Sequence, residues 1–407
     1  MKTDVVVVGG GAAGMMAAVT AARRSRAVTV VEHQKICGRK LRITGKGRCN
    51  VTNDCDVPAF LKNVARNGKF LYSALTRFPP RVAMAFFEEL GVPLKVERGN
   101  RVFPVSDNAH DIANALEAEM KNLGVKIIHA RALSMETDSG AVCAVNTDAG
   151  RIACSAAVLC TGGASYPRTG SDGGGYAMAK ALGHTVAAPL PSLAPLESGD
   201  WYCRCLQGLS LKNVVLTAFD GENRKLFSEL GEMLFTHFGV SGPLVLSASA
   251  YIRELPPGSC RLEIDLKPGL DEKKLDARLL RDFEKYRNRD FQNALDDLAA
   301  KSMIPVLVTL SGIGGETKVH SITKEQRKAF GRLLKHFPVS VTRLRPVEEA
   351  IVTAGGVAVG EIDPRTMGSK LVQGLYFAGE LIDVDAFTGG FNLQIAWSTG
   401  FAAGSNV

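Results

Sequence analysis

The chain begins with an apolar run that turns abruptly into glycines. Residues 5–8 are four consecutive valines, which is typical of a strand buried on both faces of a parallel sheet. A stretch rich in Ala and Met follows from Ala12 to about residue 24, and a second β-branched run, 27–31, ends at Glu32. Between the first strand and the helix lie three glycines in a GxGxxG pattern: Gly9, Gly11 and Gly14. The pattern predicts strand, turn, helix and strand within about thirty residues.

This combination predicts a dinucleotide site of the Rossmann type. The first glycine allows the tight turn, the second lets the backbone approach a pyrophosphate, and the third lets helix and strand pack closely. The first helical residues, Ala12 and Ala13, offer unpaired N–H groups and a partial positive charge to phosphates. Glu32, which ends the second strand, has the position of the acidic residue that binds ribose hydroxyls. A glycine turn without a ligand would not explain Glu32.

Two later strands favour FAD over NAD as the dinucleotide. The run 156–160 breaks at Thr161, Gly162 and Gly163, and the run 374–378 ends at Gly379 and Glu380. We expect both strand ends to meet the N-terminal turn, because ligands bind at the carboxyl ends of parallel strands. The Glu380 carboxylate is expected near the ribityl chain. The start of a last helix, which contains Asn392, Leu393 and Gln394, is expected at the N1–O2 edge of the flavin.

The segment 38–53 is basic and rich in glycine. It lacks the order of a P-loop, since Lys46 is followed by Gly47. We expect it to bring Arg39, Lys40 and Arg48 near the pyrophosphate or the flavin, with Arg48 as a candidate catalytic residue. The alternative is a solvated basic loop, because loops carry charge in any case.

These motifs resemble the bacterial BaiN-like flavoproteins, a family of NAD(P)/FAD-dependent oxidoreductases that includes aminoacetone oxidase and a proposed dehydro-bile-acid reductase. The resemblance rests on residues 38–40 with 44–53, 161–167, 231–243, 353–357 and 379–400. It implies an α/β fold: a Rossmann-like FAD-binding domain of the two-dinucleotide-binding-domain type, with an inserted β-rich domain that carries a helical subdomain.

The resemblance also implies domain boundaries, which the sequence supports. The FAD-binding domain is expected at 1–188 and 356–407, and the inserted substrate domain at 189–355, with helices at about 267–336. Residues 183–195 are Pro-rich and are expected to be irregular; 206–219 and 259–266 alternate like strands, and 271–300 and 324–335 have helical periodicity.

The resemblance places His237 against the flavin, where it is the candidate proton donor beside hydride transfer. A purely structural His237 is the alternative, and Cys49 is either a flavin-adjacent thiol or a buried, inert one. The residues expected to contact FAD are Gly9, Gly11, Ala12, Ala13, Gly14, Glu32, His33, Arg39, Lys40, Gly45, Arg48, Cys49, Asn50, Ala132, Thr161, Gly162, Gly163, Gly379, Glu380, Asn392, Leu393 and Gln394.

Composition narrows the function further. Nine cysteines without CxxC pairs or zinc spacing suit a reducing cytoplasm, and no metal site is expected; a redox role for Cys203 and Cys205 stays open. Four glycines interrupt the apolar stretch 5–22, so it is not a signal peptide or a membrane span. The net charge is +8, but the basic residues are spread along the chain, which argues against a nucleic-acid partner and for a small-molecule substrate.

Four functions remain open at this point. The first is a reductase that passes hydride from NAD(P)H, bound transiently, to an activated double bond. The second is an amine oxidase that passes electrons to oxygen. The third is a flavoprotein that binds or modifies RNA, and the fourth is a redox sensor without turnover. Only one GxGxxG motif is present, so we expect no separate NAD(P)H domain.

Overall fold

The computed structural model describes residues 1–407 and divides into two compact units. Unit 1 combines Met1–Ser192 with Val347–Val407, and unit 2 is Leu193–Pro346. Unit 2 is therefore slightly shorter than the insertion 189–355 expected from the sequence. The reason lies in two antiparallel strands, β12 (Val186–Ser192) and β20 (Val352–Val357), which pair with each other inside unit 1.

A five-stranded parallel sheet forms the centre of unit 1. Its strand order is β21-β11-β1-β2-β7, and every neighbouring pair is parallel. The valines of β1 are at most 2% exposed, as expected for a strand covered on both faces. The strands are β1 (Val5–Val8), β2 (Val28–Glu32), β7 (Lys126–His129), β11 (Ala156–Leu159) and β21 (Leu375–Phe377). The predicted convergence of strands from both ends of the chain is confirmed.

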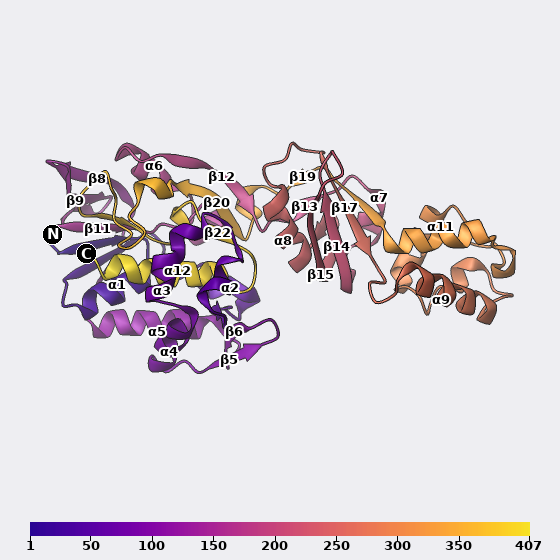
Figure 1. Ribbon diagram of the computed structural model, residues 1–407. Helices are drawn as coiled ribbons and strands as arrows, with labels where there is room; N and C mark the ends of the chain where they lie inside the picture. Colours follow the sequence, from indigo (N-terminus) through magenta and orange to yellow (C-terminus); the bar gives the residue numbers. More distant parts are fainter. The chain divides into compact units, whose positions relative to one another are not determined.

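Two helices from opposite ends of the chain, α1 (Ala12–Arg23) and α12 (Phe391–Gly404), lie side by side in unit 1 (Figure 1). Their close packing depends on glycine. A Cβ at Gly400 or Gly404 would lie 2.4 Å from the carbonyl oxygen of Ala13 or Ala17, respectively. The C-terminal segment is thereby fixed against the first helix, with its own N-terminus near the segment 52–53.

The rest of unit 1 surrounds this layer. A three-stranded antiparallel sheet has the order β10-β9-β8, a second has the order β3-β6-β5, and β22 pairs with β4. The helices are α2 (Val57–Leu61), α3 (Tyr72–Arg77), α4 (Pro80–Glu89), α5 (Ala109–Asn122) and α6 (Gly174–Ala181). The strands are β3 (Thr52–Asn53), β4 (Val64–Arg66), β5 (Leu94–Glu97), β6 (Arg101–Pro104), β8 (Ala132–Asp138), β9 (Ala141–Thr147), β10 (Gly150–Ala153) and β22 (Asp385–Ala386).

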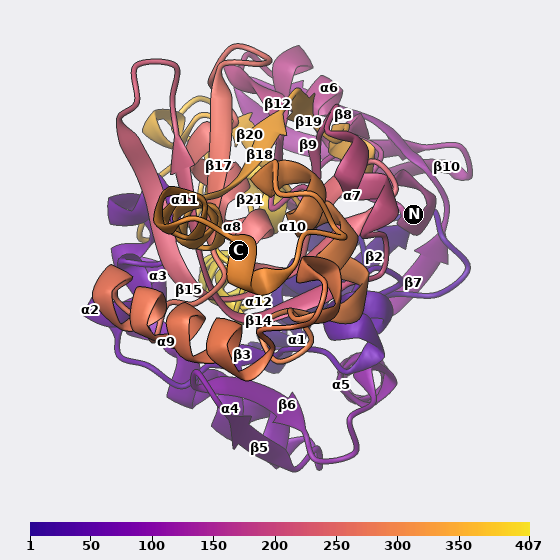
Figure 2. The same ribbon diagram turned by 90° about the vertical axis from the view of Figure 1, so that its right-hand side faces the viewer.

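Unit 2 is a seven-stranded antiparallel sheet with helices. The strand order is β18-β17-β14-β15-β16-β13-β19. Three helices of this unit, α9, α10 and α11, face the viewer in Figure 2. The strands are β13 (Leu196–Glu197), β14 (Ser210–Phe219), β15 (Lys225–Thr236), β16 (Gly239–Ser241), β17 (Cys260–Asp265), β18 (Phe337–Val341) and β19 (Arg343–Leu344). The helices are α7 (Trp201–Cys205), α8 (Pro243–Ile252), α9 (Glu272–Lys285), α10 (Ile304–Ser311) and α11 (Lys324–Lys335).

Most of the predicted elements of unit 2 are confirmed, whereas one local prediction in unit 2 and one in unit 1 are wrong. The strands expected at 206–219 and 259–266 are β14 and β17, and the helix expected at 324–335 is α11. The helix expected over 271–300 ends at Lys285, and the stretch 183–195 contains β12 instead of being irregular. β12 accommodates its prolines because it pairs with a single partner strand. No helix has both the length and the apolar composition that crossing a membrane requires.

Candidate functional site

The glycine turn after β1 has the geometry of a phosphate site. Gly9 has φ = +104°, and a Cβ on Gly14 would lie 1.9 Å from the Gly9 carbonyl oxygen, so both positions require glycine. A Cβ on Gly11, in contrast, would meet no atom within 4 Å, so the turn faces open space there. No side chain caps the N-terminus of α1, and its first turn has no acidic residue. These N–H groups are suited to an anionic pyrophosphate.

Glu32 lies at the end of β2 beside this turn and is 9% exposed. Its Oε2 accepts a hydrogen bond from the N–H of Gly10 at 2.8 Å, and its Oε1 accepts one from the N–H of Gln34 at 2.7 Å. Each carboxylate oxygen can accept a further hydrogen bond, so Glu32 can still bind two ribose hydroxyls. His33 Nδ1 lies 3.7 Å from Glu32 Oε1. The turn and this carboxylate together fit the adenosine and pyrophosphate of FAD.

A polar network joins the carboxyl ends of β11 and β21 to the basic segment. Lys40 Nζ lies 2.9 Å from Glu380 Oε2 and 2.7 Å from Ser165 Oγ. Glu380 Oε1 accepts hydrogen bonds from Ser165 Oγ at 3.0 Å and from the N–H of Thr353 at 2.8 Å. Burial by itself would raise the pKa of Glu380, but the Lys40 charge and these hydrogen bonds hold the pKa below its usual range. The network therefore contains a paired, ionised carboxylate.

Sequence reasoning missed Ser165 and Thr353 as parts of this site. Both lie in motifs that carry the family resemblance, 161–167 and 353–357, and this was the only signal for them. The Thr353 hydroxyl accepts hydrogen bonds from the N–H groups of Ala164 (2.9 Å) and Ser165 (3.1 Å). Thr353 thus ties the turn after β11 to β20.

The start of α12 is held against β3 and carries no capping side chain. Gly389 and Gly390 have φ = +124° and +97°, and a Cβ on Gly390 would lie 2.3 Å from the carbonyl oxygen of Thr52. Asn53 Nδ2 donates to the carbonyl oxygen of Gly389 at 3.1 Å. The first N–H groups of α12 are thus a second positive helix end at the same side of unit 1, suited to negative charge on the flavin.

Several predicted contact residues use their side chains within the protein. The Asn392 side chain bridges the N–H (3.0 Å) and the carbonyl (2.7 Å) of Ala386, and Gln394 Nε2 donates to the carbonyl oxygen of Phe78 at 2.9 Å. Arg39 donates to the side chain of Gln34. These side chains shape the backbone, and contact with a cofactor at such positions would involve main-chain atoms.

The loop 44–49 is conformationally unusual. Gly45, Lys46, Gly47 and Cys49 all have positive φ, and for Lys46 and Cys49 this conformation costs on the order of 1 kcal/mol each. Cys49 is fully buried, and burial raises the pKa of its thiol to about 12, although Thr44 opposes the shift. The thiol is therefore protonated at neutral pH, which favours the buried, inert alternative.

Arg48 is held by two carboxylates instead of facing open space. Its guanidinium lies 2.6 Å from Asp107 Oδ1, also pairs with Glu97, and stacks 4.2 Å from the centre of the Phe103 ring. The hydrogen bonds that Arg48 donates to Glu97 and Asp107 raise the pKa of Arg48 further, so it is a fixed cation. Its catalytic role stays a prediction.

His237 belongs to unit 2, at the exposed turn between β15 and β16. Its ring packs edge-to-face on Phe238, with 5.0 Å between the ring centres. After the turn, β16 lies close against β13, since a Cβ at Gly239 would lie 2.3 Å from the carbonyl oxygen of Leu196. The turn presents the imidazole to its surroundings, and the predicted position against the flavin stays a prediction.

The two cysteines of the CxC pair differ in environment. Cys203 is buried, and burial raises the pKa of its thiol to about 11, whereas Cys205 is exposed. Both lie on α7, where residues two apart do not face each other. This arrangement favours two separate thiols over a redox pair.

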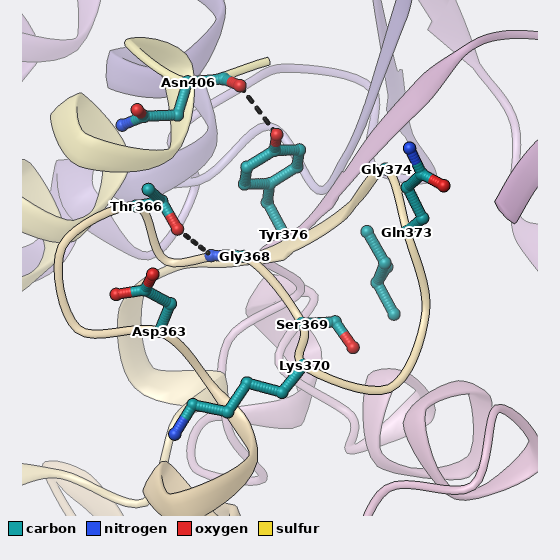
Figure 3. A pocket seen from close by; sticks show the side chains of 10 residues that line it. Asp363, Thr366, Gly368, Ser369, Lys370, Gln373, Gly374, Tyr376 and Asn406 are labelled. Carbon is teal, nitrogen blue, oxygen red and sulfur yellow. Dashed lines mark hydrogen bonds between the residues drawn. The ribbon is translucent and has the colours of Figure 1, made fainter.

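A separate hollow of about 330 Å³ lies at the opposite end of β21 (Figure 3). The Tyr376 hydroxyl donates there to the carbonyl oxygen of Asn406 at 2.6 Å. Because the residues before β21 line this hollow and Glu380 follows β21, the hollow is separate from the dinucleotide edge. Its lining is Asp363, Thr366, Gly368, Ser369, Lys370, Gln373, Gly374, Leu375, Tyr376 and Asn406.

Comparison with known proteins agrees with this geometry. The profile of the HI0933-like protein Rossmann domain matches residues 3–406. The chain is 31% identical to a 3-dehydro-bile acid delta(4,6)-reductase of Clostridium scindens, over 93% of this chain and 91% of that protein. It is 30% identical to a ribosomal RNA dihydrouridine synthase of Haemophilus influenzae and 31% identical to one of Escherichia coli, in both cases over 94% of this chain and 92% of that protein.

Solved structures agree in fold. A flavocytochrome c3 fumarate reductase aligns with a TM-score of 0.54 at 18% identity, covering 100% of this chain and 78% of the other. A 3-ketosteroid-delta4-(5alpha)-dehydrogenase of Rhodococcus jostii RHA1 aligns with a TM-score of 0.50 at 16% identity, covering 99% and 97%. At these identities the likeness shows the shared fold alone.

Proposed function

Because the chain belongs to the HI0933-like family of Rossmann-domain flavoproteins and is an FAD-dependent oxidoreductase, we propose that it reduces a carbon–carbon double bond conjugated to a carbonyl group, with NAD(P)H as electron donor. One observation carries the proposal. Relatives that align with nearly the whole chain are named for a 3-dehydro-bile acid reductase and for dihydrouridine synthases. A 3-oxo-4,6-diene and a uracil ring share a C=C bond conjugated to a carbonyl, so both names describe the same type of reduction.

The residues of unit 1 would hold the cofactor in a fixed position. The open turn at Gly11 and the first N–H groups of α1 bind the pyrophosphate, and Glu32 binds the ribose. The start of α12 stabilises negative charge. When bound, FAD supplies reversible hydride transfer. The ion pair of Lys40 with Glu380, at 2.9 Å, ties the basic segment to the end of β21. Ser165, in the turn after β11, is hydrogen-bonded to the same carboxylate.

A conjugate reduction also needs a proton. The carbon β to the carbonyl receives hydride and the α carbon receives a proton, so the product gains two hydrogens across the former double bond. His237, exposed at the turn between β15 and β16, is the proposed proton donor. Imidazole is suited to this step because its ordinary pKa lies near neutrality.

Anaerobic rapid mixing tests the proposal. The FAD-loaded protein is mixed with NADH, NADPH or a small primary amine, and the loss of oxidised-flavin absorbance is followed. A conjugated ketone or a uridine nucleotide is then added in a second mix. We expect reduction by one of the nicotinamides and reoxidation by a conjugated substrate. Fast reduction by the amine, with both nicotinamides inert, would replace this proposal by an amine oxidase.

A further inference from the structure

The helix α11 has an unbalanced charge that the fold does not require. Its twelve residues contain five Lys or Arg and one Glu. The neighbouring α9 also contains five Lys or Arg, but balances them with four acidic residues. Ion pairs on α9 include Arg278 with Asp282, at 2.7 Å. The surplus positive charge of this subdomain is therefore concentrated on α11.

Two of the five basic side chains on α11 have structural partners. Arg327 pairs with Asp276 of α9 at 2.8 Å, and Lys335 pairs with Asp265. The other three are exposed and pair with no carboxylate: Lys324, Lys328 and Arg332. They are four residues apart, so they form one line along the helix with steps of about 6 Å. We refer to these three residues as the α11 stripe.

Helix stability does not account for two of the three stripe residues, Lys324 and Lys328, although Arg332 in the last turn does suit the helix dipole. Lys324 is the first residue of α11 and Lys328 is in its second turn, where positive charge opposes the helix dipole and costs about 0.3–1 kcal/mol near the first turn. The N-terminus is already capped by Thr323 and Gln326, a neutral pair. The positive end of the dipole of α11 and the three charges of the α11 stripe together produce a positive surface. Such a surface suits a polyanion with regularly spaced charges.

We propose that the α11 stripe binds the phosphate backbone of an RNA that carries the substrate base. This inference rests on the proposed reduction of a carbonyl-conjugated double bond, since the uracil ring is such a substrate. It differs from the expectation of a small-molecule partner, which rested on the spread of charge along the sequence. RNA is favoured over other polyanions because relatives 30% and 31% identical to this chain are named for ribosomal RNA.

The test is the salt dependence of RNA binding by the FAD-loaded full chain. The probe is a fluorescent stem-loop RNA with uridines in its loop, and its binding is measured by anisotropy over a roughly fourfold range of KCl, from about 50 to about 200 mM. The test variant is Lys324→Ala, Lys328→Ala, Arg332→Ala. The matched control, Arg204→Ala, Lys212→Ala, Lys225→Ala, removes the same charge from exposed positions outside the helical subdomain.

We expect the stripe variant to bind more weakly and to lose about 2–3 units of the slope of log K against log salt, as three phosphate contacts predict. Between the two salt concentrations the affinity of the stripe variant should therefore fall by roughly 16- to 64-fold less than that of the wild type. Its melting temperature should change little, because Lys324 opposes the helix dipole whereas Arg332, in the last turn, complements it. The control should keep the wild-type slope to within about one unit.

Other outcomes would overturn the proposal. These are no RNA binding by the wild type, equal losses in both variants, or charge-dependent binding to phosphatidylglycerol vesicles in place of RNA. Reduction of a small conjugated ketone is measured in parallel and should be equal in wild type and stripe variant. If ketone reduction fails while the slope change occurs, the proposed reaction is wrong and the RNA surface stands; the reverse result removes only the RNA surface.

Discussion

Replacing Glu32 by Gln perturbs the predicted cofactor site with little change in volume. The carboxylate accepts hydrogen bonds from the N–H groups of Gly10 and Gln34, at 2.8 and 2.7 Å, and is 9% exposed. A glutamine has one acceptor oxygen, so one of these buried N–H groups loses its partner, and the charge available to the ribose is lost as well. A hydrogen bond to a charged group contributes about 1.5–3 kcal/mol. We therefore expect Glu32→Gln to weaken FAD binding roughly 10- to 150-fold.

The assay is a titration of apoprotein with FAD, followed by flavin fluorescence. Glu136→Gln is the matched control. Glu136 lies on β8, in the three-stranded sheet β10-β9-β8, and accepts hydrogen bonds from Asn146 (3.0 Å) and Arg151 (2.8 Å). Its dissociation constant for FAD should equal that of the wild type. If Glu32→Gln also binds FAD as the wild type does, Glu32 is not a ligand and the reasoning about this turn is refuted.

Four further predictions follow from the same geometry. Gly11→Val should leave the melting temperature of the apoprotein unchanged, since a Cβ there meets no atom, yet abolish FAD retention on dialysis. Lys40→Met should lower the free energy of unfolding by about 1–3 kcal/mol, because Glu380 loses its cation, and a urea titration measures this. His237→Ala should keep FAD bound and slow substrate reduction by about a hundred- to ten-thousand-fold in stopped flow; unchanged rates would remove His237 from the mechanism. Burial lowers the pKa of His184 below 6.5 despite Glu361 at 3.3 Å, so the unfolded chain takes up the proton first and the free energy of unfolding should fall as pH drops below about 6.5. His184→Asn should flatten that slope.

Four of the five strands of the parallel sheet were predictable because they are apolar runs that lead into glycine or acidic residues, whereas the edge strand β7, which is mostly exposed, has no such run. Val5–Val8 is buried on both faces in the structure, as its run of four valines predicts. The strand β15 was missed because its twelve residues are only partly buried, so polar and apolar positions do not alternate cleanly. β12 was missed because its prolines argue against a strand in the middle of a sheet. They are tolerated here since β12 pairs with one strand only.

The candidate site shows the same division between local and long-range information. The glycine turn and Glu32 are close in sequence, so their roles could be read from spacing. The link between Lys40 and Glu380 joins residues 340 positions apart, and no local pattern specifies it. Side-chain partners such as Glu97 and Asp107 for Arg48 depend equally on tertiary packing. The sequence therefore indicated which segments meet, but not which side chains pair there.

Reduction of a double bond conjugated to a carbonyl is the activity proposed for this flavoprotein, and it can be observed in a single step. The most direct measurement is anaerobic single turnover: the FAD-loaded protein is photoreduced, mixed with a conjugated ketone or a uridine-containing RNA, and followed by flavin absorbance and by mass spectrometry of the product. We expect the flavin to be reoxidised with formation of one equivalent of product that is two hydrogens heavier. Reduced flavin that persists with every conjugated substrate, yet reoxidises at once in oxygen, would contradict it.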